Sequence, residues 1–290
     1  MIIKQKGVKM KLNLTFLIFI LSINTLLSQN LATSSFDTEW LKSIVSIELI
    51  NPDGSGAPIG TGFFLTTNNN HIVLITAKHV IQHDGMIQKN LAYRLNEKNG
   101  NSILFPVSLA ETVNGSSWFL SKNADVACLF AAFKSSSDIK SIPAKFILDN
   151  SNIRDGAPVV VPGFPMGIRS EKYSNPIVRS GNIASCDSLN TIIDAFVFPG
   201  NSGGPVIYVP YVKVDDKTLK SPFLNRQMLI GIVSSYIPYV DVAISVQTKR
   251  PRITFEENTG LCNVVPGYKI IELLNREDVL DAESKIKIIK

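Results

Sequence analysis

The chain has 290 residues, of which 45% are hydrophobic and 18% are charged, with 18 glycines and 15 prolines. This length can bury a substantial core in one large or two small domains, and the composition excludes a disordered, collagen-like or coiled-coil protein. The net charge of +5 is no sign of nucleic-acid binding, because Lys4, Lys6, Lys9 and Lys11 precede the first acidic residue, Asp37, and the remaining chain is close to neutral.

The N-terminus has the layout of a secretory signal. Basic residues are followed by an apolar run, Leu12–Leu27, and then by the small and polar residues Ser28–Asn30. This order predicts a signal peptide over residues 1–29 and an exported protein, periplasmic or secreted. An uncleaved anchor is the alternative, although the run is short for a membrane-spanning helix. No other segment has the length to cross a membrane, so we expect no stable membrane insertion after cleavage.

Short strand signals, punctuated by glycine and proline, dominate the rest of the chain. A first series precedes a polar linker at Lys134–Ser141, and a second series follows it. The first series is Ser43–Ile50, Thr61–Thr66, His71–Thr76, Lys89–Leu95, Ser102–Ser108 and Asp125–Ala131. The second is Pro158–Pro162, Val178–Ser185, Thr191–Val197, Gly204–Val209, Met228–Ser234 and Leu261–Val265. Two β units of about six strands indicate an all-β sandwich or a pair of barrels.

The remaining segments contain one helix candidate and two long insertions. The best helix candidate is Tyr268–Asn275, which follows a strand and Pro266-Gly267. Two long polar insertions, Pro210–Gln227 and Ile237–Asn258, are expected to be loops. We therefore expect one β unit at about residues 41–133, a second at about 155–266 and a C-terminal tail at 276–290.

Cysteine and histidine usage gives no sign of a metal site. Cys128, Cys186 and Cys262 are too few for a disulfide-stapled scaffold, and the prediction of buried thiols leaves a Cys186–Cys262 bridge open. The three histidines, at positions 71, 79 and 83, are not spaced from these cysteines as the ligands of a metal site are. We expect neither a metal nor a cofactor.

The most informative segment is Phe198–Val206, which reads FPGNSGGPV. A serine hydroxyl becomes a good nucleophile only when a base takes its proton and donors stabilise the resulting oxyanion. The glycines allow the backbone to bend so that the N–H groups of Gly200 and Ser202 converge, and Gly203 and Gly204 are expected to leave room for a substrate backbone. Ser202 is therefore a candidate nucleophile.

A base and a carboxylate occur earlier in the chain. His79 directly follows the apolar run Ile72–Ile75, whereas His71 and His83 are expected to have exposed structural roles. Asp125 begins an apolar strand, where a carboxylate is costly unless it has a partner. The order His79, Asp125, Ser202 is that of one of the three known triad folds.

These motifs resemble the chymotrypsin-like serine peptidases, and within them the HtrA/Deg-type and trypsin-like peptidases. The residues that carry the resemblance are Gly60–Phe63, Thr76–Val80, Asp125–Ala127, Gly200–Pro205 and Gly231–Ser234. The resemblance, from about Leu41 to Asn275, implies a chymotrypsin-like double β-barrel that hydrolyses polypeptide substrates. His79 would be the general base, Asp125 its orienting partner and Ser202 the nucleophile. The N–H groups of Gly200 and Ser202 would form the oxyanion hole, and the backbone of Ser234 would pair with the bound peptide.

The chain also departs from parts of the family pattern. Digestive-type relatives are activated when a new N-terminus pairs with an aspartate before the serine, but this chain has the neutral Asn201 there, as HtrA/Deg peptidases do. No matching activation motif is present. The 15 residues after Asn275 are too few for the PDZ domain that HtrA/Deg relatives usually carry.

The resemblance also suggests which residues form the specificity pocket. Phe196 occupies the position that is aspartate in enzymes that cut after lysine or arginine, so a basic side chain should be disfavoured. Tyr236 stands where the family often has glycine, and its ring is expected to narrow the pocket toward small or aliphatic residues.

The motifs predict an exported serine endopeptidase, and two other functions are the alternatives. A catalytically silent peptide-binding or chaperone-like module on the same fold has no need of a complete triad. An α/β-hydrolase esterase disagrees with the chain order of the triad and with the lack of alternating helices, although Gly200–Gly204 satisfies the G-x-S-x-G pattern. The sequence leaves the oligomeric state open.

Overall fold

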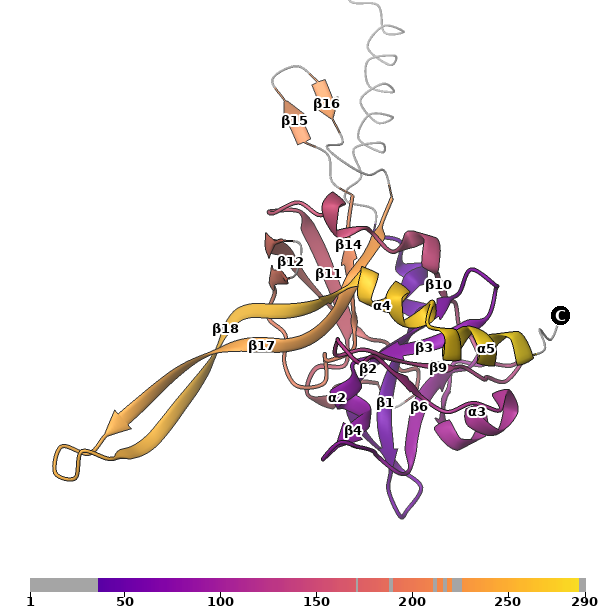
Figure 1. Ribbon diagram of the computed structural model, residues 1–290, viewed down its shortest axis with the longest axis horizontal. Helices are drawn as coiled ribbons and strands as arrows, with labels where there is room; N and C mark the ends of the chain where they lie inside the picture. The colour runs from indigo at the N-terminus through magenta and orange to yellow at the C-terminus, as the bar shows by residue number, and fades with distance from the viewer. Residues whose placement is uncertain are drawn as a thin grey trace, which may run out of the picture. The chain divides into compact units, whose positions relative to one another are not determined.

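The computed structural model describes residues 36–170, 172–187, 190–210, 213–215, 218–220 and 226–286 (Figure 1). The expected signal peptide therefore lies outside the described residues. Among the residues that are described, no helix is both long enough and apolar enough to cross a membrane.

The first half of the described chain forms an eight-stranded sheet. Its elements are η1 (Thr38–Ser43), β1 (Ile44–Ile50), β2 (Gly56–Thr66), β3 (Ile72–Thr76), α2 (Lys78–Ile81), β4 (Gln82–His83), β5 (Met86–Ile87), β6 (Leu91–Asn96), β7 (Ser102–Pro106), α3 (Val107–Asn114), β8 (Phe119–Leu120), β9 (Ala127–Phe130), β10 (Ile142–Pro143), η2 (Ala144–Phe146) and η3 (Asn150–Asn152). The strand order is β7-β6-β1-β2-β3-β9-β8, with β10 parallel to β2, while β4 and β5 form a separate hairpin.

The second half forms a closed six-stranded barrel followed by two helices. Its elements are β11 (Pro158–Gly163), η4 (Pro165–Gly167), β12 (Ile177–Cys186), β13 (Thr191–Asp194), β14 (Pro205–Tyr208), β15 (Lys213–Asp215), β16 (Thr218–Lys220), β17 (Met228–Ile244), β18 (Pro251–Pro266), α4 (Gly267–Leu274) and α5 (Glu277–Lys285). The barrel closes in the order β11-β12-β13-β18-β17-β14, and β15 pairs with β16. The predicted all-β class with a C-terminal helix is confirmed.

Each sheet encloses its own hydrophobic core. The first core includes the fully buried Phe63, Phe64 and Leu74, and the second includes Val161 and Ile193. Strands β2 and β3 contain consecutive buried residues, so both of their faces are covered, whereas β13 alternates buried and more exposed residues. Each half of the molecule therefore has its own packed interior.

The C-terminus contains two helices where the sequence indicated one. Helix α4 matches the predicted Tyr268–Asn275 and buries Ile270 and Leu273 against the first core. Helix α5 lies in the expected tail. The sequence did not predict it, because only a narrow face of the helix is buried and most of its residues are polar. On that face Glu283 accepts hydrogen bonds from Thr67 and Asn69 and lies 3.2 Å from His71 Nδ1. The sequence also missed α3, whose residues Val107 and Ser108 were assigned to a strand that ends at Pro106.

The insertion Ile237–Asn258 is not a loop. It continues β17 and β18 as a two-stranded hairpin, with register shifts at its base and near its tip, which leaves the barrel as a long projection (Figure 1). We call residues 237–258 the arm. Its strands contain the β-branched and aromatic residues that favour extended structure, and this signal was masked by interspersed acidic residues. The other insertion, Pro210–Gln227, contains the β15–β16 hairpin, and its remaining residues are only partly described.

Candidate active site

His79 is held at the end of a buried strand. Strand β3 ends at Thr76, whose hydroxyl donates to the carbonyl of Thr61 over 2.7 Å, and the short helix α2 then buries Val80 and Ile81. The opposite side of α2 carries His79, whose side chain is 51% exposed. This arrangement directs the imidazole into the space between the two halves of the molecule.

Asp125 holds the imidazole of His79. Its Oδ2 atom lies 2.7 Å from Nδ1 of His79, and its Oδ1 atom accepts the backbone N–H of His79 over 3.0 Å. The hydroxyl of Ser234 donates to Oδ2 over 2.8 Å. An ionised carboxylate is only an acceptor, so Nδ1 carries the hydrogen and Nε2 is left as the acceptor that a general base requires.

Two opposing effects act on the ionisation of Asp125. Burial raises the pKa of its carboxyl group, but the hydrogen bonds and charge of His79, together with the hydroxyl of Ser234, outweigh burial and hold the pKa below its ordinary value. The carboxylate is therefore ionised at neutral pH and can stabilise a protonated His79.

Ser202 lies on the turn between β13 and β14, and two glycines shape that turn. Gly200 has a φ of +99° and Gly203 has a φ of +81°. A Cβ on Gly200 would lie 2.3 Å from the carbonyl oxygen of Phe164, and one on Gly203 would lie 2.3 Å from that of Thr61. Gly203 is thus required by close packing of the protein's own backbone, not by room for a substrate backbone as the sequence suggested.

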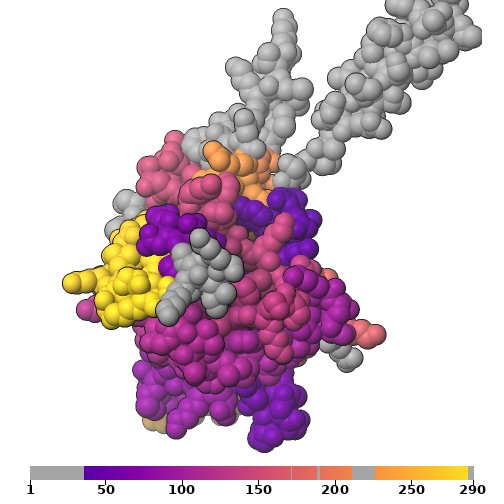
Figure 2. Space-filling model, turned by 90° about the vertical axis from the view of Figure 1, so that its right-hand side faces the viewer, coloured from indigo at the N-terminus to yellow at the C-terminus, as the bar shows by residue number. Residues whose placement is uncertain are grey.

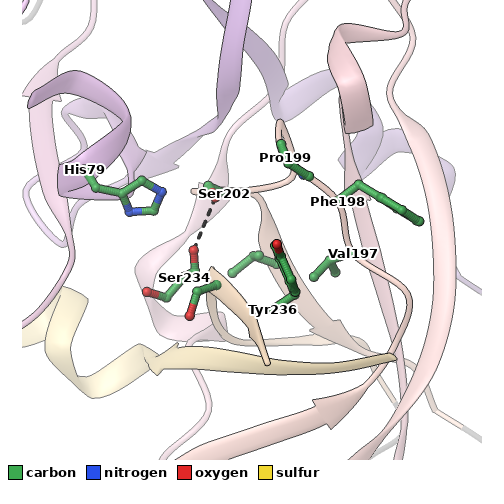
Figure 3. Close-up of a pocket in the computed structure, with 9 residues that line it drawn as sticks. His79, Val197, Phe198, Pro199, Ser202, Ser234 and Tyr236 are labelled. Carbon is green, nitrogen blue, oxygen red and sulfur yellow. Dashed lines mark hydrogen bonds between the residues drawn. The ribbon is translucent and has the colours of Figure 1, made fainter. Parts of the chain in front are cut away.

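The Ser202 hydroxyl does not point at His79 in this structure. Within the described residues its hydrogen bond goes to the carbonyl of Ser234, over 3.2 Å, although His79 and Ser202 border the same cavity (Figure 3). Catalytic hydrogen bonds are often absent before substrate binds.

The backbone around Gly200 is held from both sides. The hydroxyl of Thr61 donates to the carbonyl of Gly200 over 2.6 Å, and the N–H of Met166 donates to the carbonyl of Pro199 over 2.6 Å. The Pro199–Gly200 peptide is trans, so its N–H points opposite to the held carbonyl. In the described part of the chain, the N–H groups of Gly200 and Ser202 have no hydrogen-bond partner. Two such donors are what an oxyanion needs.

Sequence analysis missed the roles of Thr61 and Met166. Thr61 was noted only as part of the Gly60–Phe63 motif, and Met166, in η4, was not noted. A positive φ of 54° at Met166 is unusual for a residue with a side chain and is a structural sign of a constrained turn. No local sequence signal reports a contact between η4 and the serine turn.

The cavity beside Ser202 has a volume of about 290 Å³. Its lining is mostly apolar and contains no carboxylate; the lining residues are His79, Val197, Phe198, Pro199, Ser202 and Val233–Tyr236. Ser234 and Tyr236, both of which the sequence analysis assigned to substrate binding, are among these lining residues. The Tyr236 hydroxyl donates to the carboxylate of Glu256.

Phe196 does not meet its expected role as the pocket floor. Its side chain is 55% exposed, and it does not belong to the cavity lining. Strand β13 ends at Asp194, and the Phe196 ring lies near Gly260, so a Cβ on that glycine would be 3.4 Å from the ring. Val197, Phe198 and Pro199 border the cavity instead.

The other histidines and the cysteines lie outside the site. His83 is exposed as expected, but His71 is mostly buried against α5, which differs from its expected exposed role. The three cysteines are free, and burial raises the pKa of both Cys128 and Cys262 to about 12, so neither thiol is a reactive thiolate at neutral pH. The described residues contain no cluster of three or more His, Cys, Asp or Glu side chains that could hold a metal ion.

Comparison with known proteins gives one family. Residues 60–209, just over half of the chain, match the sequence model of the trypsin-like peptidase domain. No curated protein sequence matches the chain. Among solved structures, an HtrA-type protease, an AlgW variant determined with a tripeptide, aligns with a TM-score of 0.44 and 16% identity. That alignment covers 87% of this chain and 62% of the other, so the chain spans less than two thirds of that protein.

Proposed function

The chain belongs to the trypsin-like peptidase domain family, and from that premise we propose that it is a serine endopeptidase with His79, Asp125 and Ser202 as its catalytic triad. The observation that carries the proposal is the convergence of three distant segments. Asp125 contacts His79 over 2.7 Å, and His79 and Ser202 line the same cavity.

The reaction proceeds by acyl transfer. Ser202 Oγ attacks the carbonyl carbon of the scissile bond while Nε2 of His79 takes its proton, and Asp125 stabilises the imidazolium. The N–H groups of Gly200 and Ser202 stabilise the oxyanion, the C–N bond breaks, and the leaving amine takes the proton from His79. Water then attacks the acyl-enzyme by the same route, which releases the acid and restores Ser202. No cofactor takes part in these steps.

Labelling with a fluorophosphonate probe tests the activated serine. The intact chain should be labelled and the Ser202→Ala variant should not, because only an activated hydroxyl next to an oxyanion hole reacts readily. Ser235→Ala is the matched control, since Ser235 borders the same cavity but lies outside the triad. A folded chain that resists labelling would instead support the silent peptide-binding module.

We also propose that the cavity accepts small or aliphatic residues on the acyl side of the scissile bond. Its lining lacks a carboxylate, and the ring of Tyr236 occupies one wall. In kcat/KM, Ala or Val peptides should exceed Arg and Phe peptides by about 10- to 200-fold. Tyr236→Gly should raise the value for the Phe peptide by about tenfold relative to the Ala peptide. A preference for arginine in the unmodified enzyme would contradict this assignment.

Export is the remaining part of the proposal. The leader at residues 1–29 supports a periplasmic or secreted enzyme whose peptidase domain covers residues 36–275. N-terminal sequencing of the chain from its native host tests the cleavage, and a retained Met1 or Met10 would contradict it.

A further inference from the structure

The arm exposes apolar side chains on both of its faces. Strands β17 and β18 remain paired from Pro238 opposite Asn258 to Ile244 opposite Pro251, a ribbon of roughly 25 Å at the usual rise per residue. The exposed fractions run from 39% to 83% for Tyr239, Val240, Val242, Ile244, Val246, Ile253 and Phe255. Large exposed apolar side chains gathered on one projecting element are typical of an interaction surface.

The arm also has unpaired backbone edges. Strand β13 pairs with β18 only from Leu261 to Val264, and β14 pairs with β17 only from Met228 to Ile232. Among the described strands, the outer edges of the arm have no partner beyond those points. A two-stranded ribbon is marginally stable in water and its open edges invite another strand.

The sequence of β18 in the arm is complementary to itself when reversed. Residues 252–256 read Arg-Ile-Thr-Phe-Glu. When two copies lie antiparallel with Thr254 opposite Thr254, each Arg252 faces the Glu256 of the other copy. Ile253 then faces Phe255. Residues opposite one another in antiparallel strands share a face and interact directly, so both kinds of pair form twice.

We propose that the arm binds the arm of a second copy of this chain, with β18 antiparallel to β18 about a two-fold axis at Thr254. The two ribbons then form one four-stranded sheet, and the axis lies near the middle of the arm, so the two peptidase bodies sit at opposite ends. A two-fold interface needs one self-complementary surface, which this segment supplies.

The charged residues of this segment are available for the pairing. Arg252 forms no ion pair with any other residue that the structure describes, and its side chain is exposed. Glu256 accepts a hydrogen bond from the Tyr236 hydroxyl, and a carboxylate has further acceptor capacity for a guanidinium. The assembly thus connects the partner's Arg252 with the wall of the substrate cavity.

Charge reversal tests the pairing by sedimentation velocity, with Ser202→Ala in every chain to prevent self-digestion. Arg252→Glu and Glu256→Arg should each weaken the dimer by about tenfold or more, because each places two like-charged pairs in the interface. The double variant restores opposite charges and should return to near the original Kd. Lys249→Glu, which makes the same charge change at the tip outside the paired segment, should have little effect.

Disulfide cross-linking tests the axis itself. Thr254→Cys should yield a covalent dimer on mild oxidation, since the two Cα atoms would lie about 4.5–5.5 Å apart across the axis, within the range that a disulfide spans. Val246→Cys is the control, because Val246 is exposed at the tip and has no symmetric partner nearby. A chain that is monomeric at tens of micromolar would overturn the proposal. So would a dimer that both charge reversals leave intact and that Thr254→Cys does not cross-link.

Discussion

Replacing His79 by alanine is expected to lower kcat for peptide hydrolysis by about 10⁶-fold, as much as replacing Ser202. The base and the nucleophile act as one unit. The Ser202 hydroxyl is a poor nucleophile without His79, and His79 has no proton to remove without the hydroxyl. His79→Ala combined with Ser202→Ala should therefore be no slower than either single variant. Steady-state kinetics on one fluorogenic peptide give kcat for the two single variants and the double variant.

The role of Asp125 predicts a smaller loss. Asp125→Asn should lower kcat by about 10⁴-fold, because an amide can favour the wrong imidazole tautomer and cannot stabilise the imidazolium. KM should change little in each of these variants, since none of the three side chains provides most of the substrate contact. Additive losses in the double variant, or a folded Ser202→Ala chain that keeps full activity, would exclude the proposed triad.

The second large effect concerns stability: Glu48→Ala is expected to lower the free energy of unfolding by about 3–5 kcal/mol. The Glu48 side chain is fully buried in β1, and its two oxygens lie 2.7 Å from Nε and Nη2 of Arg94. Arg169 Nε lies 3.0 Å from the same carboxylate. Both arginines are mostly buried, so the substitution leaves two positive charges without their partner.

This ion cluster also connects the fold to the site. Arg169 follows η4, the turn whose Met166 N–H holds the Pro199 carbonyl. Loss of Glu48 should therefore loosen the turn that carries Gly200 and Ser202, and it should lower kcat in the fraction of the protein that remains folded. The effect on kcat separates this connection from a purely structural role for the cluster.

Urea unfolding with a surface control measures the stability change. Glu39 pairs with Lys140 over 2.7 Å, but both side chains are about half exposed, so Glu39→Ala should leave the unfolding free energy nearly unchanged. The slope of the transition should be unchanged in both variants. Equal midpoints for Glu48→Ala and Glu39→Ala would refute the importance of the buried cluster.

The positions of most strands, and the three residues of the proposed triad, were predictable from local pattern. A buried strand needs an unbroken or alternating apolar run, and the Ser202 turn needs glycines at Gly200 and Gly203, so both leave marks within a few residues of themselves. The triad was predictable for a further reason: its three short motifs occur in an order that belongs to one fold. Helix α5 left a weaker mark because only one narrow face of it is buried.

Other features depended on contacts between residues distant in the sequence. The hydroxyl of Ser202 bonds to Ser234, Phe196 turns away from the cavity, and Met166 holds the peptide of Gly200. Each is decided by which backbone groups happen to be within hydrogen-bond reach once the two halves have packed. No residue type at these positions encodes that geometry.

The arm combines a feature that the sequence reveals with one that only the structure reveals. Its strand-forming residues are visible in the sequence, but their acidic neighbours resemble those of a loop. Only the structure shows that β17 and β18 stay paired beyond the barrel. The sequence by itself determined which side chains are available for the proposed chemistry, since a nucleophile, a base and an acid each require particular side chains. The tertiary structure alone decided orientation and exposure, because these follow from packing between segments that no local pattern records.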